Sequence, residues 1–251
     1  MILAALLLGS ACFVFAGAAA GASGAEELLS RVTTRYSEEN AGRACNIRLA
    51  AERISGITLD ARESFSFNDA VGERTRENGF FEAPVIENGE YVPGVGGGVC
   101  QVSSTLFCAA LEAGLRILES HPHSLPVSYI PPSLDAMVSS GSDLKLFNPR
   151  SAPVRIEAQA EDGVLTVGVY GVKDGLVYRT ESVTLARLEA PPAREGDVLR
   201  PGREGLVSES FLCVYGEGGE LISRTRIRRD RYAPVQGIRP REGDLPQKKP
   251  K

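Results

Sequence analysis

Tryptophan is absent from this 251-residue sequence, histidine occurs only twice, and neither sign of charge predominates strongly. The formal net charge of -4 gives no reason to expect nucleic acid or an anionic membrane surface as a partner. Charged residues make up 24% and hydrophobic residues 43%, which is a globular rather than a disordered composition. The length suits one or two domains with a hydrophobic core, and no internal repeat is apparent.

Cysteine is also scarce, so we do not expect a disulfide framework. The cysteines beyond the N-terminal segment are Cys45, Cys100, Cys108 and Cys213. Cys100 and Cys108 cannot pair if one helix carries both, because eight residues rise about 12 Å and bridged Cα atoms lie within about 7 Å. Whether Cys45 and Cys213 pair stays open. The cysteines and histidines lack the paired short spacings of zinc sites, so we expect no metal and no cofactor.

The N-terminus differs from the rest of the chain. Residues 2–20 contain no charge and are almost wholly apolar or small, and Ser23-Gly24-Ala25 resembles a small-x-small cleavage site. We interpret residues 1–25 as a secretory signal peptide or, since about 20 apolar residues span a bilayer, as an uncleaved anchor. Either alternative predicts an extracytoplasmic protein, secreted or anchored to the outer face of the cytoplasmic membrane, that contacts the membrane only through this segment.

The most informative stretch is a glycine run that ends at a cysteine. Gly96, Gly97 and Gly98 precede Cys100, and a helical pattern of apolar residues then continues to about Glu119. The apolar positions are Val102, Leu106, Ala109, Ala110, Ala113 and Ile117. Cys100 is therefore expected in or just before the first turn, where unpaired N–H groups and the helix dipole favour a thiolate. The other interpretation is a buried structural cysteine whose glycines seat the helix.

Both histidines, His121 and His123, follow this helix. A cysteine with a downstream histidine is the minimum for a thiol nucleophile with a general base, and Asp135 on the next segment could orient the imidazole. His123 suits this role better because it directly enters a strand predicted over residues 125–129. The candidate catalytic residues are therefore Cys100, His123 and Asp135. A surface-turn histidine remains the alternative.

Neighbouring residues favour other chemistries less. Ser103 and Ser104 lack the G-x-S-x-G elbow of a serine nucleophile, and we expect them to satisfy N–H groups in the first helical turn. The glycine run lacks both the Lys-Ser/Thr pair of a phosphate-binding loop and the Rossmann spacing.

The pattern over residues 28–172 predicts an α+β domain, with two helices packed on largely antiparallel short strands. One helix follows a cap at Asn40 and the other begins near Cys100. Asn88-Gly89 predicts a hairpin turn. Strands are expected at residues 64–67, 80–86, 91–92, 143–147, 154–158 and 164–170.

A small all-β module with its linker is expected over residues 173–246. Strands at 211–215 and 221–227 flank a glycine-rich turn. The second strand carries Arg224, Arg226 and Arg228, which strict alternation places on one face. We interpret this face as solvated, with contact to an acidic wall polymer or a lipid headgroup as the alternative. Residues 247–251 are expected to be a disordered tail.

Several separate blocks, in order, resemble the VanW family, over roughly residues 37–171. They are FSFN at 65–68, EAPVI at 82–86, GGGVCQVSSTL at 96–106, HSLPVSY at 123–129 and DA at 135–136. The resemblance implies an extracytoplasmic protein of Gram-positive-type bacteria that works near peptidoglycan, and it specifies no reaction. The family's motif positions carry over as Gly96, Gly97, Gly98, Cys100, Gln101, Ser103, Ser104, His123 and Asp135. More loosely, residues 200–238 resemble a G5-type module, which is linked to N-acetylglucosamine or wall adhesion.

Two hypotheses follow. In the first, an envelope enzyme uses Cys100, His123 and Asp135 for acyl transfer or amide hydrolysis on a peptidoglycan stem peptide. Gly97 and Gly98 would leave room for substrate, and Gln101 or the helix N–H groups would hold the oxyanion. In the second, a non-catalytic module binds wall glycan or stem peptide through the same groove. The candidate ligand-binding residues are Gly96, Gly97, Gly98, Gln101, Ser103, Ser104 and Asn68.

Overall fold

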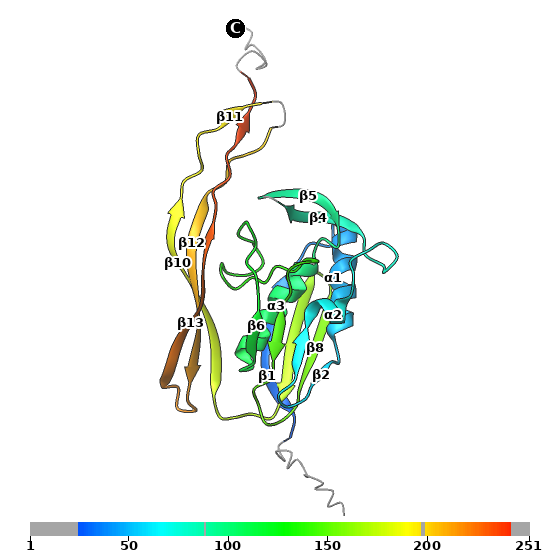
Figure 1. Cartoon of the computed structure of the whole chain (residues 1–251), viewed down its shortest axis with the longest axis vertical. Coiled ribbons are helices and arrows are strands. Elements are labelled where there is room, and N and C mark those ends of the chain that lie inside the picture. Colours follow the sequence, from blue (N-terminus) through cyan, green and yellow to red (C-terminus); the bar gives the residue numbers. More distant parts are fainter. Residues whose placement is uncertain (1–24, 88, 197–198, 242–251) are drawn as a thin grey trace, which may run out of the picture.

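The computed structural model describes residues 25–87, 89–196 and 199–241, and it has the predicted α+β character (Figure 1). Its strands pair antiparallel in every sheet except one short two-stranded pair. Residues 1–24 of the predicted leader, Asn88 of the predicted turn and the tail at 247–251 lie outside the described residues. No helix within the described ranges is long and apolar enough to cross a membrane.

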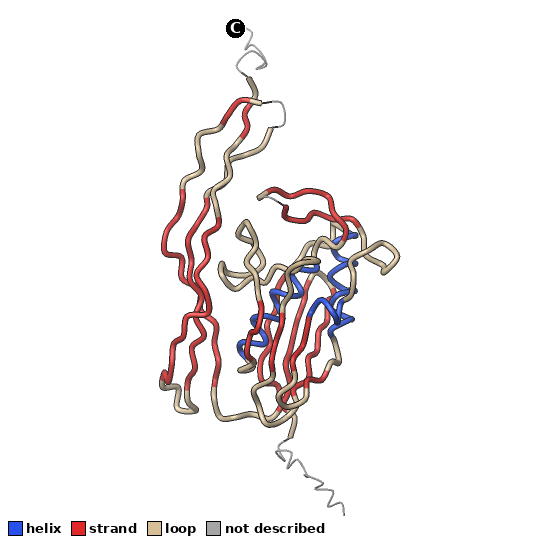
Figure 2. The backbone as a smooth tube through the Cα atoms, viewed as in Figure 1, coloured by secondary structure: helices blue, strands red, loops and turns tan. Residues whose placement is uncertain are grey.

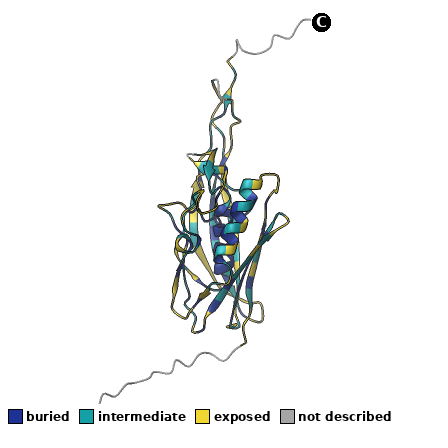
Figure 3. Ribbon diagram, turned by 90° about the vertical axis from the view of Figure 1, so that its right-hand side faces the viewer, coloured by how far each residue is buried: buried dark blue, intermediate teal, exposed yellow. Residues whose placement is uncertain are grey.

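A four-stranded antiparallel sheet forms the base of the N-terminal part. In spatial order its strands are β1 (Glu27–Arg35), β9 (Val164–Gly171), β8 (Val154–Glu161) and β2 (Thr58–Leu59). The helix α1 (Ala41–Ile54) contacts β8, and α3 (Val99–Glu112) contacts β1 and β9. Side chains at alternating positions of β8 and β9 are buried, so the helices cover one face of this sheet. Figure 3 shows the exposed residues of α1 on its outer side.

Two smaller sheets and a short helix complete this part. The three-stranded sheet contains β3 (Ser64–Ser66), β7 (Lys145–Phe147) and β6 (Arg116–Glu119). A separate hairpin is formed by β4 (Glu82–Glu87) and β5 (Glu90–Val95). The short helix α2 (Phe67–Val71) was not predicted, and it begins at Phe67, the last residue of the strand predicted over residues 64–67. Asn40 does cap α1, because its side chain accepts a hydrogen bond from the Arg43 N–H.

The predicted extension of the long helix to Glu119 is wrong. The helix ends at Glu112, and Gly114 adopts φ +74°, a left-handed conformation that terminates helices. The N–H of Leu115 then bonds back to the Ala110 carbonyl. Ile117, expected on the helix, instead pairs with Leu146 of the neighbouring strand.

The strand predicted over residues 125–129 is also wrong, and His123 therefore lies in a loop. Pro122 and Pro126 lack the N–H that a strand ladder requires, and Pro131 ends the segment. The segment is a loop that forms no strand pairing, but it packs the alternating side chains of Leu125, Val127 and Tyr129 toward the protein interior.

The C-terminal part is a sheet that stands beside α3 and the loops around residues 123–138 (Figures 1 and 2). It contains β10 (Val177–Leu188), β12 (Gly205–Tyr215) and β13 (Leu221–Tyr232), with β11 (Arg194–Glu195) and β14 (Ile238–Arg239) paired farther along. Polar contacts fasten it to the N-terminal part: Ser208 and Ser133 share a 2.6 Å hydroxyl contact, and the Ser182 hydroxyl donates to the Pro132 carbonyl.

The four described cysteines form no disulfide with one another. Cys45 and Cys213, whose pairing the sequence left open, are both free thiols. Cys108 is 3% exposed and belongs to the hydrophobic core. Burial raises the pKa of this thiol well above its usual value, so Cys108 stays protonated and unreactive.

Candidate active site

The glycine loop that leads into α3 is shaped by close packing. Gly98 is the residue before the helix and has φ +107°, and Gly96 has φ +89°. A Cβ at Gly97 would lie 2.6 Å from the Pro84 carbonyl oxygen of β4. Atoms of the protein itself pack closely against these glycines. Close packing therefore accounts for Gly97 and Gly98, rather than the room for substrate that was predicted.

Asn46 of α1 holds this loop in place. Its amide nitrogen donates to the carbonyl oxygens of Gly97 and Phe81, each at 2.9 Å, and its amide oxygen accepts from the Phe81 N–H at 2.8 Å. A buried polar residue on an apolar helix face usually bonds to backbone groups, and Asn46 does so here. Its side chain fixes the approach to Cys100, which is the second residue of α3 as the periodicity predicted.

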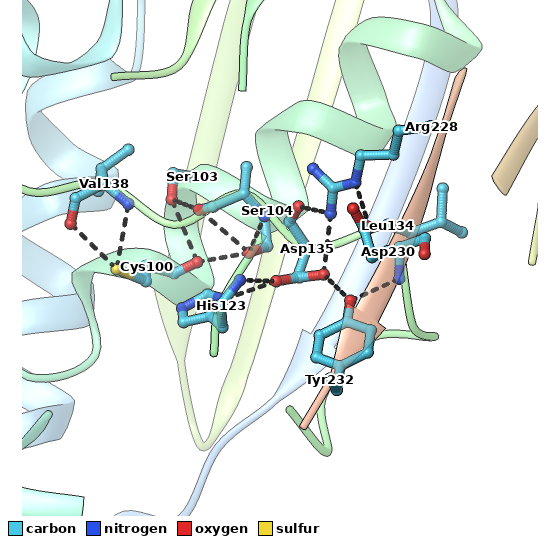
Figure 4. Close-up of polar contacts among 12 residues, drawn as sticks. Cys100, Ser103, Ser104, His123, Leu134, Asp135, Val138, Arg228, Asp230 and Tyr232 are labelled. Atoms are coloured by element: carbon cyan, nitrogen blue, oxygen red, sulfur yellow. Dashed lines mark hydrogen bonds and ion pairs between the residues drawn. The ribbon is translucent and has the colours of Figure 1, made fainter. Parts of the chain in front are cut away.

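Cys100, His123 and Asp135 come together, although only the first lies in a helix (Figure 4). Asp135 Oδ2 lies 2.7 Å from His123 Nδ1 and also accepts from the His123 backbone N–H at 2.7 Å. The other side of the imidazole faces the sulfur of Cys100 (Figure 4). The Cys100 sulfur also lies 3.4 Å from the Val138 carbonyl oxygen and 3.5 Å from the Val138 nitrogen.

The second carboxylate oxygen of Asp135 is held by the C-terminal sheet. Tyr232 donates a hydrogen bond of 2.6 Å to Oδ1, and Arg228 Nη2 donates to the same atom at 2.9 Å. Arg228 also bonds to Asp230 at 2.7 Å, and its guanidinium lies over the Phe107 ring. Asp135 is 1% exposed, and hydrogen bonds from His123, Tyr232 and Arg228 compensate for the burial of its charge.

The interpretation of all three arginines on β13 as a solvated face is wrong for Arg228. Arg224 and Arg226 are exposed and pair with Glu181 and Glu209, but the Arg228 side chain is only 13% exposed. The register between β12 and β13 shifts at this point, so that one additional residue lies in β13 between Arg226 and Arg228. This β-bulge reverses the alternation and turns Arg228 inward.

The charges of the site favour a thiolate–imidazolium pair. Burial alone would raise the pKa of Cys100, but hydrogen bonding to His123, its positive charge, the Val138 backbone and Arg74 bring that pKa below its usual value. Burial would lower the pKa of His123, but Asp135 and Cys100 raise it to about 9. Burial likewise opposes ionisation of Asp135, whereas His123, Arg228 and Tyr232 lower its pKa.

Ser103 and Ser104 are both fully buried and bond to the backbone, but their partners are the Cys100 carbonyl and the Ala136 peptide groups rather than the first-turn N–H groups that were predicted. Ser104 donates to the Cys100 carbonyl at 2.7 Å and accepts from the Ala136 N–H at 2.9 Å, while Ser103 donates to the Ala136 carbonyl at 2.6 Å. These bonds fasten the segment that follows Asp135 to the first turns of α3. Neither serine lines the cavity described next.

A cavity of about 860 Å³ opens above Cys100. The glycine loop, the β4–β5 hairpin and the loops that carry His123 and Val138 form its walls. Of the predicted site residues, its lining includes Gly96, Gly97, Gly98, Cys100, Gln101 and His123. The lining also includes polar and aromatic residues that were not predicted as site residues, namely Arg43, Arg74, Tyr36, Tyr91 and Tyr129.

Gln101 and Asn68, both predicted to bind ligand, are occupied within the protein. The Gln101 amide nitrogen donates to the Thr34 hydroxyl at 2.9 Å and to the Arg35 carbonyl at 3.0 Å, so it is not free to hold an oxyanion. The Asn68 amide nitrogen donates to the carbonyls of Ser139 and Ser142, and Asn68 does not line the cavity.

Comparisons with known proteins agree with the motif blocks. A family model described as VanW like protein matches residues 42–170. An "Uncharacterized protein YoaR" from Bacillus subtilis (strain 168) is 42% identical over 143 residues, which cover 57% of this chain and 47% of that protein. The "Vancomycin B-type resistance protein VanW" from Enterococcus faecalis (strain ATCC 700802 / V583) is 28% identical over 134 residues, 51% of this chain and 49% of that protein. The chain thus spans about half the length of these relatives. No solved structure matches.

Proposed function

The chain belongs to the VanW-like protein family, and we propose that it is a cell-envelope enzyme that uses Cys100 for acyl transfer or amide hydrolysis on a peptidoglycan stem peptide. The observation that carries this proposal is the contact chain from Asp135 through His123 to a thiol at the floor of a cavity. A buried carboxylate that orients an imidazole against a nucleophile is the arrangement of cysteine and serine acyl-transfer enzymes.

In the proposed reaction, the Cys100 thiolate attacks the carbonyl carbon of a peptide amide. Nδ1 of His123 is engaged by Asp135, so the Nε2–H is the proton that His123 donates to the leaving amine as the C–N bond breaks. This step leaves a thioester on Cys100. Water or an incoming amine then attacks the thioester carbonyl, His123 accepts its proton, and the C–S bond breaks to restore the thiolate. The positive end of α3 favours the thiolate between turnovers.

The envelope location is part of the proposal and rests on two features. One relative bears the printed name of a vancomycin resistance protein. The uncharged run at residues 2–20 predicts export of the chain. A G5-like role for the C-terminal sheet, in wall adhesion, stays a prediction within the same proposal.

The alternative is a non-catalytic module that binds wall glycan or stem peptide. The size of the cavity and its aromatic and cationic lining favour ligand binding whether or not turnover follows. Under this alternative, Cys100 contributes no chemistry and its replacement by serine is nearly silent for binding.

The test is to incubate the full chain with soluble stem-peptide fragments and to measure its intact mass and the released products. We expect a thioester adduct on Cys100 and cleaved or transferred peptide, both absent in a folded Cys100→Ser variant. Binding of the same fragments by both proteins, with no adduct and no product, would overturn the enzyme proposal in favour of the binding module.

A further inference from the structure

Two arginines flank the glycine loop next to Cys100. Arg43 of α1 lies against Gly98, where an added Cβ would come within 3.0 Å of Arg43 Cγ. Arg74, in the loop after α2, lies against Gly96, where an added Cβ would come within 2.9 Å of Arg74 Cβ. Both arginines line the cavity, and the charge of each interacts with Cys100. The absence of side chains on the glycines lets the two cations approach the loop from either side.

A neutral amide holds each guanidinium. Arg43 Nη2 donates to Gln101 Oε1 at 2.7 Å, and Arg74 Nη2 donates to Asn68 Oδ1 at 2.5 Å. In both cases the amide nitrogen is fixed by two further acceptors, which orients the oxygen toward the arginine. Gln101 and Asn68 thus fix the directions of two cations without neutralising their charge.

Neither guanidinium forms an ion pair within the described part of the chain. Asp143 attracts Arg74, but its carboxylate is already bonded to the Ser66 hydroxyl and to the N–H groups of Asn68 and Leu144. Glu73 and Glu87 line the cavity, are exposed, and make no ion pair with either arginine. Burial lowers the pKa of both arginines, and at neutral pH a guanidinium remains charged.

We infer that Arg43 and Arg74 bind a carboxylate of the substrate, so that the site selects acidic peptides whose free carboxylate lies close to the amide that reacts with Cys100. This inference rests on the proposed function, because it gives the substrate class of the same site. An oriented guanidinium without a carboxylate partner in a half-buried cavity is suited to a ligand anion, and two of them can bind one carboxylate from both sides.

The experiment compares alkylation of Cys100 by iodoacetate and by iodoacetamide, which differ in a carboxylate and a neutral amide. The full chain is used, and modification of Cys100 is read by peptide mass spectrometry because the chain has other thiols. For Arg43→Gln and Arg74→Gln we expect the ratio of the iodoacetate rate to the iodoacetamide rate to fall about tenfold, as for loss of a hydrogen bond to a charged group. Arg43→Lys and Arg74→Lys should recover part of the ratio.

Two matched variants control for net charge. Arg48→Gln changes a residue on the same helix as Arg43, and Arg76→Gln changes a residue in the same loop as Arg74. Both of these arginines are exposed and paired with Glu38 and Glu82. We expect the rate ratio to stay at its wild-type value in both, because neither residue lines the cavity.

The outcomes separate the inference from the proposed function. Equal loss of rate with both reagents in the Gln variants would mean that the arginines act on the thiolate alone, which overturns the inference and leaves the proposed enzyme intact. A wild-type Cys100 that reacts with iodoacetamide no faster at neutral pH than an ordinary thiol would instead count against the proposed enzyme.

A second measurement uses only the wild-type chain, so it stays valid where a variant fails to fold. Acetyl-Ala-Ala should slow alkylation of Cys100 by iodoacetamide more than its C-terminal amide does. Acetyl-Ala-Glu-amide carries the carboxylate on a side chain instead, and stronger protection by this peptide would identify an acidic side chain as the recognised group. Equal protection by all three peptides would overturn the inference.

Discussion

The Tyr232 hydroxyl donates a hydrogen bond of 2.6 Å to Oδ1 of Asp135, although the two residues lie 97 positions apart. Tyr232 also accepts from the Ser133 N–H at 2.8 Å, and it is 1% exposed. The family match ends at residue 170, so the carboxylate that orients His123 is positioned by a residue outside the matched segment. The C-terminal sheet is therefore structurally part of the site, whatever else it binds.

Tyr232→Phe is expected to reduce the free energy of unfolding by about 2–4 kcal/mol, because it removes a hydrogen bond to a buried charged group and leaves the buried Ser133 N–H without its acceptor. It should also raise the pKa of Asp135 toward its usual value, since Tyr232 is one of the groups that lower that pKa. Urea unfolding and carboxyl carbon NMR titration measure the two effects. Tyr178→Phe removes an exposed bond to Asp174 and should change neither quantity appreciably.

Asp135→Asn is expected to lower the pKa of His123 from about 9, because the amide carries no charge to stabilise the imidazolium. The free energy of unfolding at neutral pH should fall by about 3–5 kcal/mol, as for a buried ion pair that loses one partner. NMR titration is direct here, because the chain contains only two histidines. Asp174→Asn, which breaks the more exposed pair with Arg150, serves as the control.

The same substitution should change the dependence of stability on acid. The pKa of Asp135 is lower in the folded chain than its usual value of 3.8, so its stabilisation is present above that value and is lost as pH falls through the folded pKa. Asp135→Asn should therefore lose less stability than the wild type between neutral and strongly acidic pH. An unchanged acid dependence would contradict the lowered pKa.

Alkylation of Cys100 by iodoacetamide should be faster than that of an ordinary thiol at any pH below about 8.5, the usual cysteine pKa, because the pKa of Cys100 is lowered. The lowered pKa of Cys100 means that its thiolate fraction falls only when pH drops through that lower value. The charged and titratable groups whose fields interact with Cys100 are His123, Arg74, Arg43 and Tyr129.

His123→Asn should raise the pKa of Cys100 and slow its alkylation at pH 6, since the imidazolium is the main group that lowers that pKa. Full folding of this variant is checked by circular dichroism. His121→Asn is the matched control, because His121 bonds to Glu119 away from the thiol. If the alkylation rate of Cys100 depended on pH in the same way in the wild type and in His123→Asn, the thiolate–imidazolium pair of Cys100 and His123 would be contradicted.

Gly97→Ala is expected to destabilise the fold by about 1–3 kcal/mol, as for overpacking of a close contact. The new Cβ would lie 2.7 Å from the Ala83 carbonyl carbon, a backbone atom of β4 that cannot move away alone. Gly141→Ala is the control, because nothing lies within 4 Å of a Cβ there. Thermal unfolding measures the difference, and equal transitions for both variants would show that the loop is loosely packed.

Some local features were predictable because short-range rules govern them. The Asn40 cap and the strands β8 and β9 follow from residues within a few positions of one another. The predictions failed where local rules competed. Gly114 ended α3 despite continuing periodicity, and Pro126 kept an alternating segment out of any sheet.

The sequence by itself determined that Cys100 opens a helix behind a glycine loop, and the motif order identified His123 and Asp135 as its partners. These features depend on periodicity and on conformations that only glycine adopts readily. Only the tertiary structure decided that Arg43 and Arg74 flank the thiol and that Arg228 and Tyr232 hold Asp135. Such contacts join distant segments, and one bulged residue in β13 reverses which side chains face inward, so no local pattern reveals them.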